Sequence, residues 1–413
     1  MPSVDSRPVP IRARDLPRSF WWLWLAMLVT WMGRFVVPFM TLFLTNQLGF
    51  GVGTAGAIVA GYGGGVVVSA LVGGILVDRV GRKKTLVGSQ LLSAGVMVLI
   101  PFFPEAVWIA SLMFLFGLVN GAAQPAISTL VTDLVPRTHR RQAFAYTYWA
   151  VNLGYAIGPM IAGFVAEQAF HYLFFAQAGV LVISAAIVVS RVSDSYVPER
   201  AAQVPNQDGQ KSPTGLLSVF RDRVFILFVA GLFLYSVVYV QSTAALPLTM
   251  ASQGLSSQQY GLLLTLNGFI LCLFQIPSAK YLERWPRERV MLVFLCVTAL
   301  GVLIQAFATD WIWYAVAVAI WSIGEMGIHP TGQSIAADMA SKRLRGRYLG
   351  AYALAFSAAT MIGPLFGGFM IQFFGATALW LACTAICLAV ALFLTSTAKV
   401  RQNRIRSLRP PTA

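Results

Sequence analysis

Charged residues are scarce in this sequence. Asp, Glu, Lys and Arg make up 11% of its 413 residues, against about a quarter in soluble domains, and hydrophobic residues make up 57%. This composition excludes an ordinary soluble protein. Acids are the scarcest, with 15 Asp and Glu against 30 Lys and Arg, so the formal net charge is +15. Such a charge is typical of nucleic-acid binding or of a membrane protein, and the positions of the bases distinguish the two.

The sequence also lacks a disulfide framework, a metal-ligand spacing and a phosphate-binding loop. Its four cysteines all lie in apolar runs: Cys272, Cys296, Cys383 and Cys387. The missing Walker loop means that ATP does not drive this protein directly, and we expect neither a metal nor another cofactor. The stretch before Arg18 has no apolar segment, so we expect the first long apolar run to act as the insertion signal.

Long apolar runs are what the sequence has in abundance. Runs of this length predict membrane-spanning helices. The sequence therefore predicts an all-α membrane protein with twelve transmembrane helices, at residues 19–45, 53–77, 85–103, 107–133, 143–166, 172–193, 223–249, 257–281, 290–308, 311–340, 347–373 and 377–397.

The basic residues favour one side of the membrane. Of the 30 Lys and Arg, 29 lie in the tails and in alternate loops, and the remaining one, Arg34, lies inside the first helix. Lys and Arg concentrate in cytoplasmic loops. We therefore expect both termini in the cytoplasm, and the charge indicates a membrane protein rather than a nucleic-acid-binding one.

The sequence repeats itself at a constant offset of 205 residues. Gly56 matches Gly261, and further pairs keep the same register without a gap, among them Arg82 and Arg287, Asp133 and Asp338, and Gly158-Pro159 and Gly363-Pro364. A repeat of this kind predicts two pseudo-symmetric six-helix bundles. The expected domains are a cytoplasmic N-terminal tail (1–18), a first bundle (19–193), a cytoplasmic linker (194–222), a second bundle (223–397) and a basic cytoplasmic tail (398–413).

A charged turn joins the second and third predicted helices. It reads Gly74-Ile-Leu-Val-Asp78-Arg79-Val-Gly81-Arg82-Lys-Lys. This spacing resembles the signature loop between helices 2 and 3 of the major facilitator superfamily, which implies the two-bundle fold of that family and a gate on the cytoplasmic side. The resemblance implies gate residues Gly74, Asp78, Arg79, Gly81, Arg82 and Asp133, with Glu283, Arg287 and Asp338 in the second half. The alternative is solvated surface charge, which contributes little.

Asp78 lies at the C-terminal end of its helix, where the helix dipole disfavours an acid. The resemblance and this dipole argument together place Asp78 near the N-terminus of helix 11, around residues 346–350, when the cytoplasmic side is closed.

A glycine-proline motif recurs in both halves. Its residues are Gly154, Gly158, Pro159 and Gly163 in helix 5, and Gly363 and Pro364 in helix 11. Small residues at these spacings allow close helix packing, and proline loosens the preceding turn. The motif resembles the antiporter motif of drug exporters in the same superfamily. The alternative is packing without a role in antiport.

Three ionisable residues lie deep inside predicted spans. Glu325 and His329 are one turn apart in helix 10, and Arg34 is at a matching depth in helix 1. A charge at that depth is costly unless it is paired or neutralised, and it usually has a function. We expect these three residues to couple transport to protons, with Glu325 as the carrier. The alternative is a permanent Glu325–Arg34 ion pair that ties the halves together.

Polar and aromatic residues accompany these charges at helical spacing. They predict a pocket for hydrophobic or cationic compounds, although such residues also serve packing. The candidate cavity residues are Trp31, Asn120, Gln124, Tyr148, Asn152, Tyr235, Tyr239, Trp321 and Tyr352.

The resemblance implies a secondary active transporter, not an enzyme, that works by alternating access in the inner membrane of a bacterium. Its expected partners are a small-molecule substrate, protons and the bilayer, with no nucleic acid, and we expect a monomer. The first hypothesis is proton-coupled export of small hydrophobic or drug-like compounds, as in the twelve-span drug:proton antiporters. The second is proton symport or facilitated uptake of a small polar or anionic nutrient, with Arg34 binding the anion. A third, a membrane sensor that transports nothing, is disfavoured because no signalling domain is attached.

Overall fold

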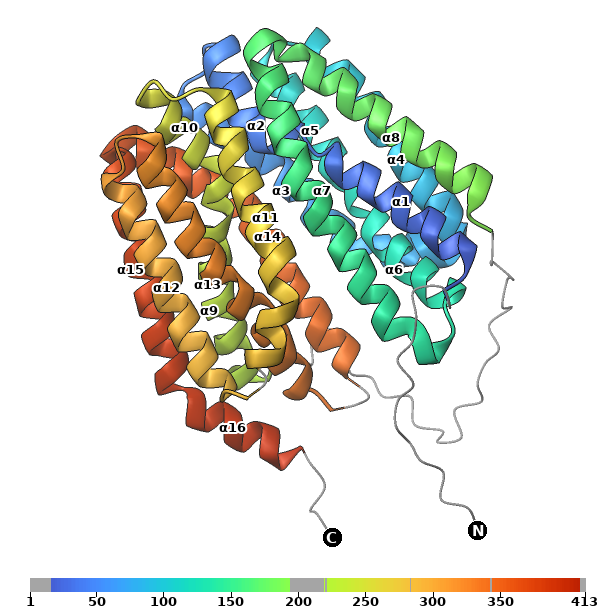
Figure 1. Cartoon of the computed structure of the whole chain (residues 1–413), viewed down its shortest axis with the longest axis vertical. Coiled ribbons are helices and arrows are strands. Elements are labelled where there is room, and N and C mark those ends of the chain that lie inside the picture. Colours follow the sequence, from blue (N-terminus) through green and yellow to red (C-terminus); the bar gives the residue numbers. More distant parts are fainter. Residues whose placement is uncertain (1–15, 194–218, 220, 283, 342–343, 409–413) are drawn as a thin grey trace.

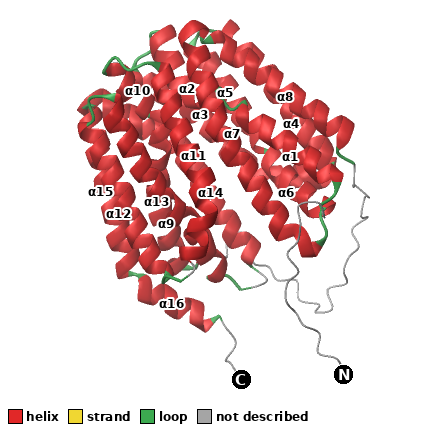
Figure 2. Cartoon of the chain, in the orientation of Figure 1, coloured by secondary structure: helices red, strands yellow, loops and turns green. Residues whose placement is uncertain are grey.

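The computed structural model describes residues 16–193, 219, 221–282, 284–341 and 344–408. Within these residues the chain is helical, with short connections and no strand (Figures 1 and 2). This confirms the predicted all-α class.

The helices of the first half share the blue-to-green part of the chain in Figure 1. They are α1 (Arg18–Met32), α2 (Val36–Leu42), the π-helix η2 (Phe43–Gln47), α3 (Val52–Val80), α4 (Arg82–Leu99), the 3₁₀-helix η3 (Ile100–Phe102), α5 (Ala106–Gly121), α6 (Ala123–Leu134), the 3₁₀-helix η4 (Arg137–His139), α7 (Arg140–Ala169) and α8 (His171–Arg191). Those of the second half are α9 (Arg223–Ala244), α10 (Leu246–Ser252), α11 (Ser257–Leu282), α12 (Arg287–Phe307), α13 (Trp311–Asp338), α14 (Arg345–Phe374), α15 (Ala376–Ser396) and α16 (Ala398–Ser407).

Eleven segments of the described chain are long and apolar enough to cross a membrane. They coincide with eleven of the twelve predicted spans. The remaining predicted span corresponds to α11, a 26-residue helix that begins at Ser257 and contains residues whose side chains lie outside the description. The many apolar side chains exposed on the outer helix faces, among them Phe102, Ile312 and Leu392, are explained by contact with lipid.

The first span is interrupted where its charge lies. Helix α1 ends at Met32 and α2 begins at Val36, so Arg34 lies in the break. The Gln177 side-chain oxygen accepts hydrogen bonds from the backbone N–H groups of Phe35 (3.1 Å) and Val36 (2.9 Å). Backbone groups freed at membrane depth must find partners inside the protein, and Gln177 supplies one.

The two halves meet through glycines. A Cβ atom on Gly56 of α3 would lie 2.4 Å from the Pro364 carbonyl oxygen in α14, and one on Gly261 of α11 would lie 2.3 Å from the Pro159 carbonyl oxygen in α7. These two contacts are related by the 205-residue repeat, so the pseudo-symmetry of the sequence is also a symmetry of the interface. Only glycine permits so close a backbone approach.

The two ends of the molecule differ. We call the end where α3 ends and α4, α12 and α14 begin the basic end, because it carries Arg82, Arg287 and Arg345; the other end is the opposite end. Contacts between α3 and α14 extend from Gly368 to Thr360. Toward the basic end they cease, since no described atom lies within 4 Å of a Cβ placed on Gly346 or Gly350. The halves are thus closed together at the opposite end and apart at the basic end.

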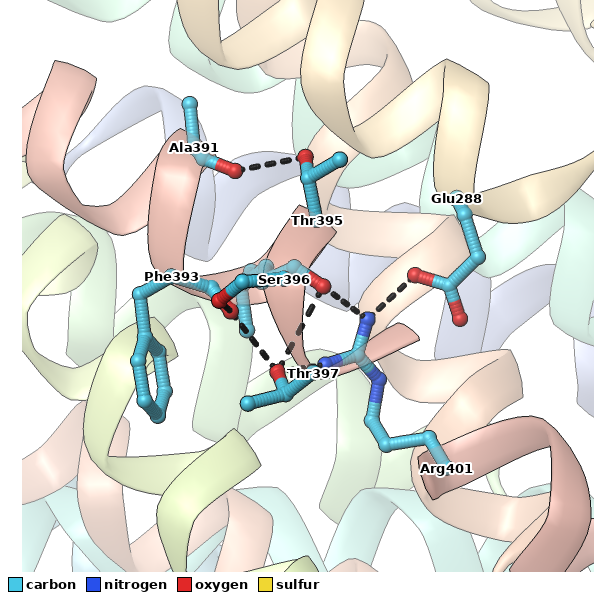
Figure 3. A network of polar contacts seen from close by, with 8 residues as sticks. Glu288, Ala391, Phe393, Thr395, Ser396, Thr397 and Arg401 are labelled. Carbon is cyan, nitrogen blue, oxygen red and sulfur yellow. Dashed lines mark hydrogen bonds and ion pairs between the residues drawn. The ribbon is translucent and has the colours of Figure 1, made fainter. Parts of the chain in front are cut away.

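Helix α16 packs against the basic end of the second half (Figures 1 and 3). The sequence predicted only a basic tail here. Arg401 is 1% exposed, forms an ion pair with Glu288 of α12 and donates to the Leu394 carbonyl oxygen at 2.6 Å. Arg404 pairs with Asp222 at 3.4 Å. These contacts fix a polar helix that has little apolar surface to bury.

Candidate functional site

A cavity of about 580 Å³ lies between the two halves. Helices α1, α6 and α7 line it from the first half, and α9, α11, α13 and α14 line it from the second. Its α14 residues, from Leu349 to Ser357, precede the Thr360–Gly368 contact with α3. The cavity therefore lies on the basic-end side of the contact that closes the opposite end.

Glu325 of α13 lines this cavity and is 9% exposed. Its carboxylate accepts a hydrogen bond from the Asn267 side-chain N–H of α11 at 3.2 Å, and Asn267 also donates to the Ser322 hydroxyl at 2.9 Å. The Tyr239 side chain of α9 also interacts with Glu325. The carboxylate thus has polar partners but no cationic one among the described residues.

His329 lies one helical turn from Glu325 in the same cavity. Its ring makes edge contacts with Tyr235 (5.7 Å between centroids), Tyr239 (5.2 Å) and Phe356 (5.9 Å). These aromatic rings come from α9 and α14, so α13 places its titratable face against an aromatic wall.

Arg34 occupies a separate, smaller space. Its guanidinium donates to the Asn120 side-chain oxygen at 3.0 Å and lies 3.9 Å from the centre of the Trp31 ring. It lines a cavity of about 110 Å³ that shares Trp31 and Tyr155 with the larger one. No ion pair joins Arg34 to Glu325 in the described structure, so the alternative of a Glu325–Arg34 pair tying the halves together is not seen in this conformation. Asn120 and Trp31 hold the guanidinium instead.

The two charged positions correspond through the repeat. Arg34 and Tyr239 occupy matching positions at the offset of 205, and so do Asn120 and Glu325. In the first half the contact joins a guanidinium to an amide, and in the second it joins a phenol to a carboxylate. The same helix crossing therefore carries a cation in one half and an acid in the other.

Six of the nine predicted cavity residues line the large cavity. They are Trp31, Gln124, Tyr148, Asn152, Tyr239 and Tyr352. The other three lie behind it: Asn120 holds Arg34, while Tyr235 and Trp321 are 2% and 7% exposed and pack on His329 and Tyr239. Sequence periodicity cannot distinguish a wall residue from the one that supports it.

The predicted gate residues lie at the basic end in two similar sets. Arg82 of α4 pairs with Asp133 of α6 at 2.9 Å, and Arg287 of α12 pairs with Asp338 of α13 at 2.5 Å. The fourth predicted acid, Glu283, lies outside the described residues. Gly81 has a φ of 99°, a left-handed conformation that favours glycine in this short turn.

Asp78 and Arg79 are exposed, and Asp78 makes no hydrogen bond or ion pair with a described residue. A Cβ on Gly74 would likewise meet no described atom within 4 Å. The contact expected between this helix end and the start of α14 is therefore absent here. That contact was expected for a closed cytoplasmic side, whereas the basic end is open.

The glycine-proline motif lies in two helix interfaces. Gly154 and Gly158 of α7 contact Trp31 and Met32 of α1, and a Cβ on Gly158 would lie 2.4 Å from the Met32 carbonyl oxygen. In α14, Gly363 contacts Val240 of α9. The prolines of both motifs, Pro159 and Pro364, and the glycines that follow, Gly163 and Gly368, contact the other half. The motif thus positions Trp31 beside the cavity and joins the two bundles.

Two amides that bind site segments were missed from the sequence. Asn267 is an amide in the apolar middle of α11, and that signal could have identified it as a candidate partner for Glu325. Gln177 is a lone amide in α8, but its partners, the backbone N–H groups at the break in the first span, cannot be identified from its own segment.

Residues 23–256 and 242–411 each match the family model of the Major Facilitator Superfamily. The chain belongs to this superfamily. It is therefore a secondary transporter and not an enzyme, as the sequence predicted. The all-helical arrangement of the described residues, with eleven candidate membrane spans, is consistent with the fold of this family.

Three curated relatives are similar to it over most of their length. A transporter of the same superfamily, YttB of Bacillus subtilis, is described as uncharacterized and is 28% identical over 95% of this chain and 97% of its own. A Na(+), Li(+), K(+)/H(+) antiporter of Planococcus maritimus is 27% identical over 80% of this chain and 84% of its own. The multidrug resistance protein MdtH of Yersinia pestis is 24% identical over 87% and 88%.

Among solved structures, a mutant of the peptide transporter POT superposes with a TM-score of 0.78. The match covers 96% of this chain and 97% of the other, at 20% identity. This similarity concerns the fold.

Proposed function

We propose that this protein exports small hydrophobic or drug-like compounds by alternating access, driven by an inward proton gradient, with Glu325 as the proton carrier. The observation that carries the proposal is a carboxylate 9% exposed in a cavity lined by both halves. Movement of one half against the other changes the water and the partners around such a group. Its proton affinity then differs between the two open states, as coupling requires.

The lining of the cavity supports a hydrophobic substrate. Aromatic rings from both halves surround it: Trp31, Tyr148, Tyr155, Tyr239, Tyr352 and Phe356. Apolar walls with a few polar groups are typical of sites for drug-like molecules. An ionised Glu325 would also attract a cationic compound, so that proton and substrate would favour opposite charge states of the same carboxylate.

The relatives support the two parts of this proposal separately. One is named an antiporter that exchanges cations for protons, and another is named a multidrug resistance protein. We extend proton antiport and drug export to this chain on that basis, together with the glycine-proline motif. No cofactor is required, since the gradient supplies the energy, and we propose that a monomer suffices.

The basic end faces the cytoplasm in this proposal, and both termini lie there. The support is the distribution of Lys and Arg, of which 29 of 30 lie on that side. Since the relatives are bacterial, we propose the inner membrane as the location. Single cysteines at Gln47, Gln168 and Ser252 of a cysteine-free variant should react with an impermeant reagent from outside, and cysteines at Gln203 and Thr412 only after permeabilisation. Outside labelling at Gln203 would overturn this orientation.

One observation favours a second function, the uptake of a small polar or anionic nutrient. Arg34 is held by an amide and an aromatic ring, and its guanidinium has no carboxylate partner in the described structure. A buried cation without a counter-charge could bind the anionic group of a substrate. In that case Arg34 would lie in the substrate site rather than in the proton pathway.

Transport in proteoliposomes distinguishes the two functions. Export predicts that an imposed proton gradient drives a hydrophobic cation against its own gradient, in the direction opposite to proton flow. Symport predicts movement in the same direction as the proton. Facilitated uptake predicts no response to the gradient. Candidate substrates can be found by a thermal-shift screen of the purified protein.

A further inference from the structure

A carboxylate of one half caps a helix of the other half at the opposite end. Glu167, in the last turn of α7, accepts a hydrogen bond from the backbone N–H of Gln258 at 3.2 Å. Gln258 is the second residue of α11, whose first N–H groups have no partner within the helix. One turn earlier, a Cβ on Gly163 would lie 2.9 Å from the Ser257 carbonyl oxygen. The glycine therefore brings the two backbones together, and Glu167 reaches over the helix start.

The repeat places a related packing contact on the other side of the molecule. Gln372 of α14 matches Glu167, and Gly53 of α3 matches Gln258, both at the offset of 205. A Cβ on Gly53 would lie 1.9 Å from the Gln372 side-chain oxygen, so this amide packs on the start of α3. Gly368 lies one turn before Gln372 and contacts Val52 and Gly53 at the start of α3. In the same way, Gly163 contacts Ser257 and Gln258 at the start of α11.

We propose that Glu167 and Gln372 form a pair of latches that hold the opposite end closed, with Glu167 the stronger of the two. Each joins the two halves, so each contact must break when the opposite end opens. A helix N-terminus carries partial positive charge, and a carboxylate is stabilised there more than an amide is. The latch residues touch neither cavity, so they set the balance between conformations and do not bind the substrate.

The latches complement the gate at the basic end. Asp78 is an acid at a helix end that has no described partner, and the start of α14 near Gly346 and Gly350 is open. In this conformation Glu167, at the opposite end, accepts a hydrogen bond from the N-terminus of α11. Asp78, at the basic end, contacts no helix N-terminus among the described residues. Alternating access would exchange these two conditions. The inference rests on the alternating access of the proposed function and not on its proton coupling or its substrate.

Spin-label distances test the latches in purified protein without substrate. In a cysteine-free variant, labels at Gln47 and Ser252 report on the opposite end, and labels at Lys84 and Arg289 report on the basic end. Glu167→Ala and Glu167→Gln should lower the ratio of opposite-end-closed to opposite-end-open molecules by about twofold to fivefold, the factor that one charge at a helix terminus supplies. Gln372→Glu adds a carboxylate to the second latch and should raise the same ratio.

Glu105→Gln is the matched control. Glu105 is also an exposed acid beside a helix start at the opposite end, but it precedes α5 of its own half as the N-cap residue, and its side chain forms no described bond to the other half. Equal distance distributions for Glu167→Ala, Glu105→Gln and the parent protein would overturn the latch. A gain with Gln372→Glu would support it even if Glu167→Ala proved unstable. If neither label pair changed its distance in any variant, with or without substrate, the proposal of alternating access would be wrong. Loss of proton coupling alone would leave the effect of the latch variants on the label distances unchanged.

Discussion

Gly56 and Pro364 form a backbone contact between the two halves that their repeat counterparts, Gly261 and Pro159, form again. A Cβ at either glycine would lie within 2.4 Å of the proline carbonyl oxygen. The two contacts lie on either side of the pseudo-symmetry axis and close the opposite end. They explain why the glycine-proline motif occurs in both halves, since each half supplies one glycine and one proline to the interface.

A larger side chain at Gly56 should shift the protein away from this conformation. We expect Gly56→Leu to destabilise the closed opposite end by about 1–3 kcal/mol, the usual cost of overpacking. The open opposite end would then become more populated. A cysteine at Ala355, which lines the cavity, should react faster with an impermeant reagent from outside. Gly95→Leu is the control because a Cβ at Gly95 meets no described atom. Equal labelling rates for Gly56→Leu and Gly95→Leu would contradict this role of Gly56.

Asp78→Asn should slow transport without weakening the conformation described here. Asp78 is exposed and has no described partner in this conformation, so we expect thermal stability within about 0.5 kcal/mol of the parent protein. In the conformation with a closed basic end, the lost charge should cost about 0.3–1 kcal/mol at the start of α14. Transport rate and substrate affinity should be measured together, with Lys84→Gln as the control. A wild-type rate in Asp78→Asn would show that the loop has no gating role.

Arg401→Met should destabilise the second half. Arg401 is 1% exposed and binds Glu288, Thr397 and the Leu394 carbonyl oxygen. Removing one partner of a buried ion pair costs about 3–5 kcal/mol, and the 16% exposure of the Glu288 side chain places this case at the lower limit. The denaturation midpoint of detergent-purified protein measures the loss. Arg406→Met, at an exposed position of the same helix, should change it little. Adding Glu288→Leu to Arg401→Met should restore part of the stability, and no restoration would show that the pair is not the cause.

Much of the fold could be predicted from the sequence because a membrane limits the possibilities. Apolar runs identified the spans, and the match of Gly56 with Gly261 and of Gly158-Pro159 with Gly363-Pro364 identified the repeat. The break at Arg34 was missed because the residues on both sides of it are apolar, and Gln177, which accepts from the freed backbone groups, lies 143 positions later. Helix α16 was missed because its anchors, Glu288 and Asp222, come from distant segments.

The site was predictable in its composition but not in its pairings. Depth in the membrane identified Glu325, His329 and Arg34 as residues of one region. The partners of Glu325 and Arg34, which are Asn267 and Asn120, depend on helix rotation that periodicity does not fix. The absence of contact at Asp78 depends on which conformation is present, and one sequence encodes both conformations of an alternating-access protein.

The proposed role of Glu325 is the central claim, and Glu325→Gln tests it most directly. Glutamine keeps the size of the side chain and can still accept from Asn267, but it cannot carry a proton. Purified Glu325→Gln should therefore fold, bind substrate and exchange it across the membrane. Asn267→Ala, which removes the partner but keeps the carboxylate, is the matched variant and should retain proton-driven transport at a changed pH dependence.

The measurement is substrate accumulation in proteoliposomes at an imposed proton gradient, compared with counterflow exchange in the same vesicles. For Glu325→Gln we predict that accumulation falls to a concentration ratio of about one while exchange continues, because coupling requires a proton affinity that differs between the two states. Full gradient-driven accumulation in a well-folded Glu325→Gln protein would contradict the assignment of Glu325 as the proton carrier.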